Sequence, residues 1–363
     1  MGQLTPRPGI MDITPYKGGE SALKGVDRII KLSSNEGPFG PSPRAVEVMK
    51  KTSEIQHRYP DGGATRLRKK LAEKHNVDAD QIVCGAGSDE LLGLLCRAYA
   101  GPGDEVLYSD HGFLMYPIAA KSVGATPVTA MEKDLTTDVD ALLAATTDKT
   151  KIVFVANPNN PTGTYISRTE MKRLRNGLRD DILLVIDAAY AEFMTQDDYD
   201  AGFELAGSTN NTVMTRTFSK MYGLGGVRLG WSYSCAEIAD VLNRARNPFN
   251  VTSLALAAGE AALDDDEFVA MTRAHNTKWL RWTEEECRKL GLETTTSHAN
   301  FALVRFPHDT KHSSTNADAF LRNKGIIVRA MASYGLGDCL RISIGTEEEM
   351  TTLMAALKEF MEQ

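Results

Sequence analysis

The sequence predicts an α/β fold built on a mostly parallel β-sheet. From residue 59 to about residue 234, short apolar runs alternate with helical patterns, which is the arrangement of βαβ units. Two of the runs, residues 151–156 and 182–187, are apolar almost throughout, as strands buried on both faces are. The chain of 363 residues is long enough for one large and one small domain.

Each expected element follows from its local pattern. Residues 1–28, rich in Pro, Gly and Lys, are expected to form an arm without a core of its own. Helical patterns cover residues 91–99 and residues 252 to about 290, with a break near Asp264. A final helix is expected through Phe360, with the acidic residues 347–349 in its first turn. Further strands are expected at residues 105–108, 228–234, 301–306 and 340–344.

These elements divide the chain into three expected parts. They are the N-terminal arm (1–28), a large domain (55–248), and a small α+β domain made of two segments (29–54 and 249–363).

Composition argues against several classes of protein. Charged residues make up 25% of the chain and hydrophobic residues 42%, which is ordinary for a soluble enzyme. The net charge of -7, without a basic stripe, argues against nucleic acid as a main partner. No stretch approaches 18 apolar residues and the N-terminus has no apolar h-region. We therefore expect neither membrane insertion nor export, and the predicted location is the cytoplasm.

Cysteine and histidine spacing does not indicate a metal centre. The five cysteines are scattered, odd in number and without CxxC or Cys/His spacing, so we expect reduced thiols packed as small hydrophobes. His111 and His298 have no partners at metal-ligand spacing. No catalytic metal is expected.

Lys220 is the most informative residue for function. It follows an apolar stretch, and beyond it come three glycines within four residues and then Arg228. A lysine in this setting suits an amine that condenses with an aldehyde. The hydroxyls of Thr217 and Ser219 and the guanidinium of Arg228 can hold a phosphate carried by the same molecule. A phosphate-bearing aldehyde predicts pyridoxal 5'-phosphate, for which a Schiff-base lysine is the known protein handle.

Two other predicted strands end in residues that suit this cofactor. Asp187 ends the run 182–187, and ligands of open α/β sheets bind at that edge. A carboxylate there can pair with a protonated pyridine nitrogen, and Tyr190 can donate to the phenolate oxygen of the ring. Asn160 follows the run 151–156 in a turn that two prolines make rigid, so its amide can face the same oxygen.

A turn of small residues predicts the phosphate site. Gly85, Ala86, Gly87 and Ser88 connect an apolar run to a helical pattern, and backbone N–H groups at a helix start attract anions. The third glycine of a dinucleotide-binding fingerprint is Glu90 here, so that fingerprint fails. A single phosphate fits this turn and a pyrophosphate does not.

Together these segments resemble the fold type I pyridoxal-phosphate-dependent aminotransferases of class I/II. Within that family the finer pattern is most similar to the histidinol-phosphate aminotransferases. The resemblance covers nearly the whole chain, and further matching segments are residues 32–41, 58–61, 113–116, 325–329 and 340–346. It implies a large cofactor-binding domain with a mostly parallel seven-stranded sheet and a smaller α+β domain.

The resemblance also implies roles around the cofactor. Lys220 would hold it and move a proton between the substrate and the cofactor, Asp187 would keep its pyridinium protonated, and Phe113 would lie over its ring. The residues that would bind its phosphate are Ala86, Gly87, Ser88, Thr217, Ser219 and Arg228. Tyr59 matches a residue that reaches this phosphate from the neighbouring subunit, which implies a homodimer.

On the substrate side the resemblance implies two arginines. Arg341 matches the residue that binds the carboxylate of glutamate, and Arg329 one that joins it in binding the phosphate of histidinol phosphate. Tyr16 and Asn35 match further substrate-side positions. The implied activity is amino transfer between histidinol phosphate and 2-oxoglutarate in histidine biosynthesis.

Other activities remain open at this point. The same fold serves aromatic amino acid aminotransferases and phospho-amino-acid decarboxylases, and the residues around Lys220 do not separate them. The reaction depends on which substrate bond lies perpendicular to the ring. A regulator with an aminotransferase-like domain would carry an N-terminal DNA-binding module, and only the short arm (1–28) precedes the motifs here.

Overall fold

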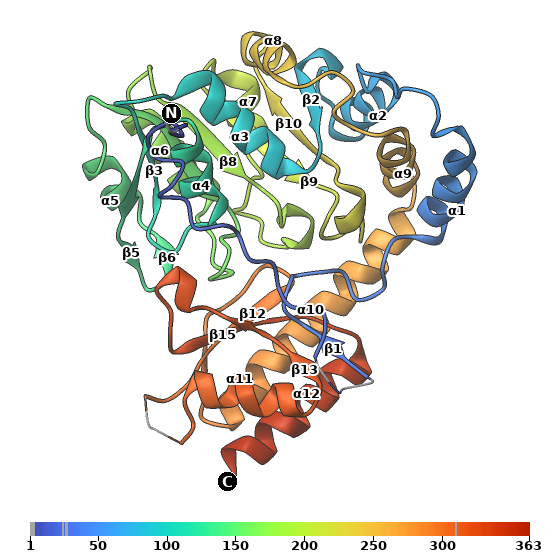
Figure 1. The fold of residues 1–363 in the computed structure, drawn as a ribbon, viewed down its shortest axis with the longest axis vertical. Coiled ribbons are helices and arrows are strands. Elements are labelled where there is room, and N and C mark those ends of the chain that lie inside the picture. The colour runs from blue at the N-terminus through green and yellow to red at the C-terminus, as the bar shows by residue number, and fades with distance from the viewer. Residues whose placement is uncertain (1–3, 24, 26–27, 309–310) are drawn as a thin grey trace.

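The computed structural model describes residues 4–23, 25, 28–308 and 311–363. These residues form two bodies, each built around its own β-sheet (Figure 1). The larger body contains a seven-stranded sheet and the smaller one a four-stranded sheet. The α/β class and the mostly parallel seven-stranded sheet predicted from the sequence are confirmed.

The large sheet has the strand order β2-β10-β9-β8-β7-β3-β4. Strand β10 runs antiparallel to both of its neighbours, and the other adjacent pairs are parallel. The strands are β2 (Ile82–Gly85), β3 (Glu105–Ser109), β4 (Thr126–Ala130), β7 (Thr150–Ala156), β8 (Leu183–Asp187), β9 (Thr212–Thr217) and β10 (Gly230–Ser234). Because β7, β8 and β9 are parallel neighbours, Ala156, Asp187 and Thr215 lie side by side near one edge of the sheet.

Helices cover both faces of this sheet. In β7 the alternate residues Ile152 and Phe154 join one apolar cluster, and Val153 and Val155 join another, as the period of two in a strand requires. The first cluster includes α3 (Ser88–Tyr99), α4 (Met115–Ser122) and α8 (Ala236–Ala245). The second includes α5 (Val139–Ala144), α6 (Arg168–Gly177) and α7 (Phe203–Ser208).

Three further helices pack together beside the antiparallel end of the large sheet. They are α1 (Pro43–Thr52), α2 (Thr65–His75) and α9 (Ser253–Leu263), and their apolar faces form one cluster with Met214 and Trp231. Helices α1 and α9 come from segments that the sequence analysis assigned to the small domain. In the structure these two helices pack with the large sheet instead. The expected domain boundaries at residues 55 and 249 stay a prediction.

The small body combines segments from both halves of the chain. Its four-stranded sheet has the order β11 (Glu293–Thr294), β12 (Phe301–Arg305), β15 (Cys339–Ser343) and β14 (Arg329–Ala330). Strand β1 (Ile30–Lys31) pairs in parallel with β13 (Ile326–Ile327). The helices are α10 (Asp266–Lys289), α11 (Ser314–Asn323) and α12 (Glu347–Met361). The acidic residues 347–349 form the first turn of α12, as predicted, and Glu349 and Thr346 form a capping box there.

Short elements complete the described chain. They are the hairpin β5 (Glu132–Lys133) and β6 (Thr136–Thr137), and the 3-10 turns η1 (Ser53–Ile55), η2 (Ala79–Gln81), η3 (Ala191–Phe193), η4 (Gly225–Val227) and η5 (Ala332–Tyr334).

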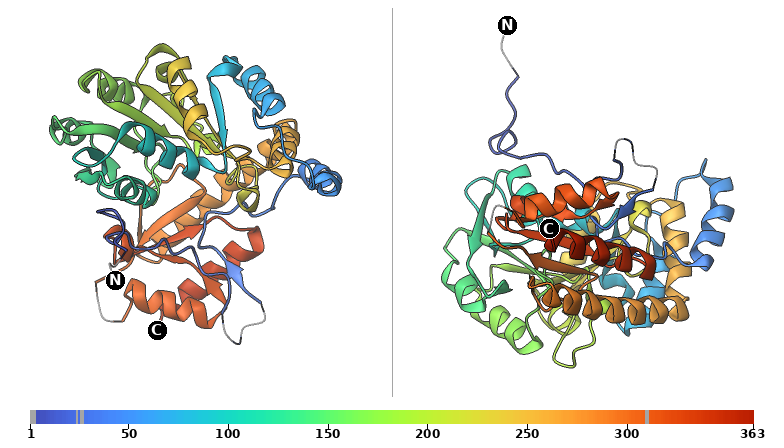
Figure 2. Two further views of the ribbon diagram at one scale, coloured as in Figure 1. Left: turned by 45° about the horizontal axis from the view of Figure 1, so that its top comes forward. Right: turned by 90° about the horizontal axis from the view of Figure 1, so that it is seen from below.

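The N-terminal segment runs along the outside of the large body. Residues 4–23 contain no helix or strand, and the outer end of this segment projects beyond the two bodies (Figure 2). Two hydrogen bonds attach this segment to α4: Arg7 Nη2 donates to the Ser122 carbonyl over 2.8 Å, and Lys121 Nζ donates to the Asp12 carbonyl over 3.0 Å. The segment then passes Tyr16, which brings it to the space between the two bodies.

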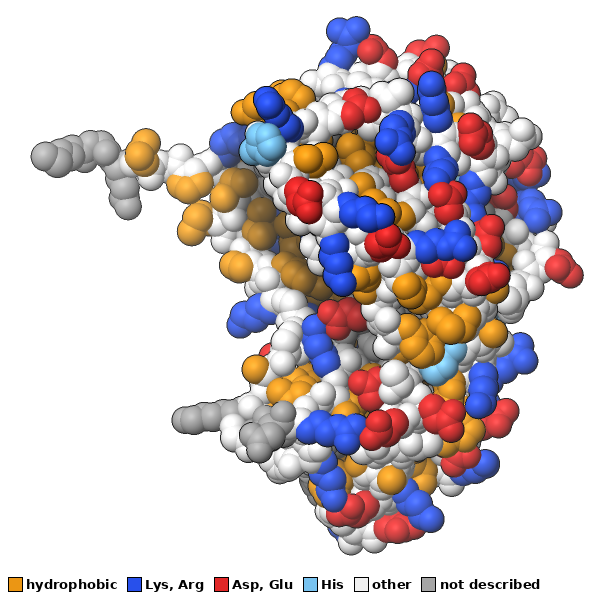
Figure 3. All heavy atoms as spheres, turned by 90° about the vertical axis from the view of Figure 1, so that its right-hand side faces the viewer, with side chains coloured by type: hydrophobic (Ala, Val, Ile, Leu, Met, Phe, Trp, Pro, Cys, Tyr) orange, Lys and Arg blue, Asp and Glu red, His pale blue; other side chains and the backbone are white. Residues whose placement is uncertain are grey.

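Surface charge is mixed over much of the molecule. On the face shown in Figure 3, Lys and Arg side chains alternate with Asp and Glu side chains rather than gathering in areas of one sign. Within the described residues, we find no helix with both the length and the apolar character needed to cross a bilayer. The described His, Cys, Asp and Glu side chains form no group of three or more that suits a metal ion.

Candidate active site

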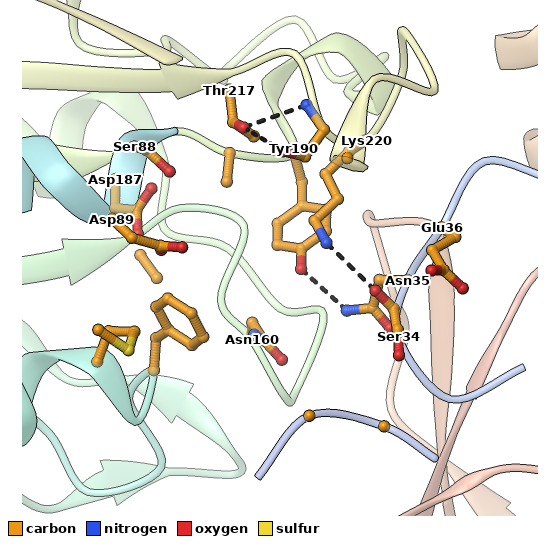
Figure 4. A pocket seen from close by; sticks show the side chains of 18 of the residues that line it. Ser34, Asn35, Glu36, Ser88, Asp89, Asn160, Asp187, Tyr190, Thr217 and Lys220 are labelled. Carbon is orange, nitrogen blue, oxygen red and sulfur yellow. Dashed lines mark hydrogen bonds between the residues drawn. The ribbon is translucent and has the colours of Figure 1, made fainter. Parts of the chain in front are cut away.

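A cavity of about 330 Å³ lies where the two bodies meet the ends of the large-sheet strands. It is lined by segments from both ends of the chain, from Tyr16 in the N-terminal segment to Arg341 in β15. Of the side chains that the sequence analysis singled out, the cavity brings together Tyr16, Asn35, Ser88, Phe113, Asn160, Asp187, Tyr190, Thr217, Ser219, Lys220, Arg228, Arg329 and Arg341. Many of them point toward one another in the close view (Figure 4).

Lys220 projects into the middle of this cavity. It follows β9 in a tight turn, and its Nζ donates to the carbonyl of Ser34 over 3.3 Å (Figure 4). Burial lowers the pKa of Lys220 to about 8, and the positive charge of Arg341 acts in the same direction. A substantial fraction of this amine is therefore neutral, and nucleophilic, near pH 8.

Asp187 lies at the end of β8, almost completely buried. The hydroxyl of Tyr116 donates to its Oδ2 over 2.9 Å, and Thr215 Oγ1 lies 3.4 Å from its Oδ1. Burial raises the pKa of Asp187 to about 6, although the hydrogen bond from Tyr116 opposes this shift. A carboxylate in this position can accept a hydrogen bond from a cationic N–H of a ligand.

Tyr190 and Asn35 meet inside the cavity. Asn35 Nδ2 donates to the Tyr190 hydroxyl over 2.9 Å (Figure 4). Asn35 adopts a left-handed backbone conformation with φ 54°, which asparagine tolerates better than most residues. Its backbone N–H donates to Ser343 Oγ over 2.7 Å, and its carbonyl accepts from Asn300 Nδ2 over 3.0 Å. Four polar contacts thus hold Asn35 where its amide faces Tyr190.

Arg341 orients the amide of Asn160. Its Nη1 donates to Asn160 Oδ1, so the NH2 group of the asparagine is left to donate to another acceptor. Arg341 Nη2 donates to the Ser33 carbonyl over 3.1 Å. Its Nε is buried and has no hydrogen-bond partner among the described residues. A buried donor in this state favours an anionic ligand.

A second group of polar residues lies around the start of α3. Thr217 Oγ1 donates to Ser219 Oγ over 2.9 Å, and Arg228 Nη2 lies 3.2 Å from Asp89 Oδ2. Gly87 has φ 86°, and a Cβ added there would lie 2.4 Å from Arg228 Nη2. Glycine is therefore required for the guanidinium to approach the backbone at the first turn of the helix, where the dipole favours negative charge.

The amide of Ala86 is already engaged. Its N–H donates to Glu90 Oε2 over 2.6 Å, and the same oxygen accepts from Asn250 Nδ2 over 2.8 Å. Neither Ala86 nor Gly87 lines the cavity. The side chains of this group that line the cavity include those of Ser88, Thr217, Ser219 and Arg228.

The remaining expected residues occupy more exposed positions. Arg329 lines the cavity and donates through Nη2 to the Lys17 carbonyl over 2.6 Å, so it also holds the N-terminal segment. Tyr16 is about half exposed beside it. Tyr59 lies outside the cavity, is 83% exposed, and stacks on Phe249 with the ring centroids 4.7 Å apart.

Comparison with known proteins defines the family. The family model for aminotransferase class I and II matches residues 27–357. The chain belongs to this family. Two closely similar curated relatives are histidinol-phosphate aminotransferases from Paramagnetospirillum magneticum, with 64% identity over 98% of each chain, and Rhodospirillum rubrum, with 58% identity over 98% of this chain and 96% of the relative.

Solved structures agree with this aminotransferase assignment. Histidinol-phosphate aminotransferase from Sinorhizobium meliloti, in complex with pyridoxal-5'-phosphate, matches with a TM-score of 0.84 and 28% identity over 92% of each chain. Aspartate aminotransferase from Thermus thermophilus matches with a TM-score of 0.81 over 92% of this chain and 91% of the other, at 21% identity, which shows the shared fold.

Two residues of this aminotransferase site were not predicted from the sequence. Tyr116, fully buried, binds Asp187, and Ser34 provides the carbonyl that Lys220 contacts. Tyr116 lies three residues after Phe113, one turn further along the chain at the start of α4. The sequence signal that could have indicated Tyr116 was its place in the first turn of a helix that follows a strand of the large sheet.

Proposed function

We propose that this aminotransferase transfers an amino group between histidinol phosphate and 2-oxoglutarate, using pyridoxal 5'-phosphate bound covalently to Lys220. The observation that carries this proposal is that one cavity is lined by Lys220, Asp187, Asn160 and Tyr190. The curated relatives, 64% and 58% identical over nearly the full chain, support the choice of substrate.

The cavity fits the chemistry of the cofactor. Thr217, Ser219, Arg228 and Ser88 would hold its phosphate, with Gly87 allowing the close approach of the guanidinium. Asp187 would pair with the ring nitrogen, and Phe113 would lie against the ring. When bound, pyridoxal 5'-phosphate supplies a conjugated ring that accepts the electron pair of the substrate bond that breaks.

Tyr190 and Asn160 would both donate to the ring oxygen. The hydroxyl oxygen of Tyr190 already accepts from Asn35, so its own proton is free to be donated elsewhere. The carbonyl oxygen of Asn160 already accepts from Arg341, so its NH2 group is free as well. These two orientations support the roles that the sequence analysis assigned to both residues.

Lys220 would also act as the acid and base of the reaction. Its pKa of about 8 is close to physiological pH, which suits a group that must both take up and release a proton. Because the amine sits in the middle of the cavity, it can reach the α-carbon of a substrate held by Arg341. The unpaired Nε of Arg341 would bind the carboxylate of glutamate in one half-reaction.

Arg329 and Tyr16 would bind the phosphate of histidinol phosphate in the other half-reaction. Both line the cavity, and Arg329 also binds the N-terminal segment at the Lys17 carbonyl. Asn35 lines the same cavity, but its backbone binds Ser343 and Asn300 and its amide is engaged with Tyr190. We therefore assign Asn35 to the orientation of Tyr190 in addition to its expected substrate-side position.

The assembly is proposed to be a cytoplasmic homodimer. Tyr59 is exposed and does not line the cavity of its own chain, which supports a role in the site of a neighbouring subunit. The mixed surface charge and the net charge of -7 support small molecules, rather than nucleic acid, as the main partners.

A panel of amino donors tests this proposal. Purified enzyme loaded with pyridoxal 5'-phosphate is mixed with histidinol phosphate, phenylalanine, tyrosine or glutamate, and the change in cofactor absorbance is followed. The proposal predicts conversion by histidinol phosphate and by glutamate at low concentration. A preference for phenylalanine or tyrosine would indicate an aromatic aminotransferase, and carbon dioxide release a decarboxylase.

A further inference from the structure

A buried polar cluster lies next to the cavity but outside it. It consists of His111, Glu132 and Asn159, and none of these side chains lines the cavity. Glu132 has 2% of its side chain exposed and His111 20%. Burying a carboxylate so completely is costly unless several donors satisfy it. The donors that bind the Glu132 carboxylate therefore indicate its structural role.

The donors to Glu132 come from two other loops. The ring of His111 lies with Nδ1 2.8 Å from Glu132 Oε2, and the His111 backbone N–H donates to Oε1 over 3.3 Å. Asn159 Nδ2 lies 3.5 Å from Glu132 Oε1, 3.4 Å from the His111 carbonyl and 3.0 Å from Thr162 Oγ1. One carboxylate thus joins two side chains and one backbone group of the neighbouring loops.

The three loops follow three adjacent parallel strands. His111 follows β3, Glu132 follows β4, and Asn159 follows β7, and these strands are neighbours in the order β7-β3-β4. Two of the loops carry residues of the candidate site: Phe113 is two residues beyond His111, and Asn160 is next to Asn159. The cluster is therefore the point where the Phe113 loop and the Asn160 turn are tied together.

We propose that Glu132 is a positioning residue that sets the places of Phe113 and Asn160 in the active site. The proposal rests on the cofactor contacts assigned to these two residues under the proposed function. Glu132 acts through His111 on the loop that brings Phe113 to the ring, and through Asn159 on the turn that presents the Asn160 amide. The hydrogen bond to Glu132 also raises the pKa of His111, which strengthens the pairing. Misplacing such groups by about 1 Å costs on the order of 100-fold in rate.

Substitution of Glu132 tests this role. Glu132→Ala removes the acceptor for both loops, whereas Glu132→Gln keeps one acceptor oxygen and the size of the side chain. Asp318→Asn is the matched control, because Asp318 pairs with Arg322 over 2.7 Å in α11 and neither side chain lines the cavity. Three quantities are measured: the affinity of the apoprotein for pyridoxal 5'-phosphate, the pH midpoint of the bound cofactor's absorption change, and kcat with KM.

The positioning role predicts a graded result. Glu132→Ala lowers cofactor affinity about tenfold or more, moves the pH midpoint, and lowers kcat more than it raises KM. Glu132→Gln recovers most of each loss, and Asp318→Asn leaves all three quantities at the wild-type level. If Glu132→Ala changes only the melting temperature, Glu132 is merely structural and the proposal is wrong.

Two further results keep the outcomes separate. If Glu132→Ala does not fold, His111→Leu is measured instead, since it removes the same tie from the other side; wild-type values for that variant would overturn the proposal. A wild-type chain that binds no pyridoxal 5'-phosphate would overturn the proposed function itself. A wild-type chain that binds it, alongside an unchanged Glu132→Ala variant, would overturn the positioning role alone.

Discussion

The side-chain amide of Asn35 donates a hydrogen bond to the hydroxyl oxygen of Tyr190 over 2.9 Å, across 155 residues of sequence. Asn35 comes from the loop after β1, in the small body, and Tyr190 from the loop after β8, in the large body. The bond therefore sets the direction of the tyrosine proton from the opposite side of the cavity. Movement of the two bodies relative to each other would change this contact, together with those of Arg341 with Asn160 and of Lys220 with Ser34.

Reversing the polarity of this bond should impair the enzyme. Asn35→Asp replaces a donor by an acceptor, so the Tyr190 hydroxyl would donate to the new carboxylate and no longer to the ring oxygen. We expect kcat to fall roughly ten- to a hundredfold, on the scale of about 1.5–3 kcal/mol for a hydrogen bond to a charged group. Asn35→Ser, which leaves the tyrosine proton free, should lose less. Steady-state kinetics of both variants decide this, and equal losses would contradict the explanation.

Lys220→Ala should abolish turnover. The variant lacks the amine that binds the cofactor covalently, so the absorption band of that linkage should disappear, although the phosphate site can still bind the cofactor reversibly. Lys172→Ala is a suitable control, since Lys172 lies in α6 and forms an exposed ion pair with Glu204 of α7. An unchanged absorption band in purified Lys220→Ala would falsify the assignment.

Asp187→Asn should leave the fold intact but slow the chemical step. The ring nitrogen would lose its negative partner, and removing one preorganised electrostatic group of this kind costs about 3–4 kcal/mol, or roughly 100- to 1,000-fold in rate. Single-turnover kinetics with saturating amino donor isolate this step. A rate within a few-fold of wild type would refute the role of the carboxylate.

The pKa of Asp187 also predicts how the stability of the apoprotein depends on pH. The folded-state value of about 6 lies above the usual value of about 3.9, so the folded state favours the protonated carboxyl. This contribution is fully present below about pH 4 and is lost as the pH rises through 6. Asp187→Asn should therefore raise the free energy of unfolding of the apoprotein at pH 8 by up to about 3 kcal/mol, with little gain at pH 4. Thermal unfolding at both pH values measures the difference.

Arg329→Ala should separate histidinol phosphate from uncharged donors. Losing a charge-assisted hydrogen bond of about 1.5–3 kcal/mol should raise KM for histidinol phosphate ten- to a hundredfold. An aromatic donor without a phosphate should change much less. Because Arg329 also holds the carbonyl of Lys17, Arg329→Lys serves as a comparison that keeps the charge. Similar losses for both donors would argue against phosphate recognition by this residue.

Sequence patterns predicted the parts of the site that lie at strand ends. Asp187 and Asn160 follow apolar runs, and Lys220 follows a run that ends in hydroxyl residues, so local sequence places all three at one sheet edge. The same reasoning predicted four of the seven strands of the large sheet by range and placed apolar runs where β2 and β9 lie. It did not predict β4, because Thr126–Ala130 contains a proline and is only partly buried.

Contacts between distant segments could not be predicted in this way. The bond from Tyr116 to Asp187 spans 71 residues, and that from Lys220 to Ser34 spans 186. The engagement of the Ala86 amide by Glu90 depends on side-chain direction rather than on sequence pattern. The packing of α1 with α9 likewise joins segments that lie on either side of the large domain in sequence. Such pairings follow from the fold as a whole, and local pattern carries no signal for them.

Burial pushes two ionisable groups of this cavity toward their neutral forms, with pKa values of about 8 for Lys220 and about 6 for Asp187. Each charge therefore costs free energy unless a partner meets it. Pyridoxal 5'-phosphate would relieve both costs at once, since it consumes the amine and offers a cation to the carboxylate. A molecule that binds only the folded chain shifts the folding equilibrium by mass action. The quantity of folded enzyme in a cell would then depend on how much pyridoxal 5'-phosphate the cell contains. A culture starved of the vitamin from which this cofactor is made, vitamin B6, should yield less of the protein itself.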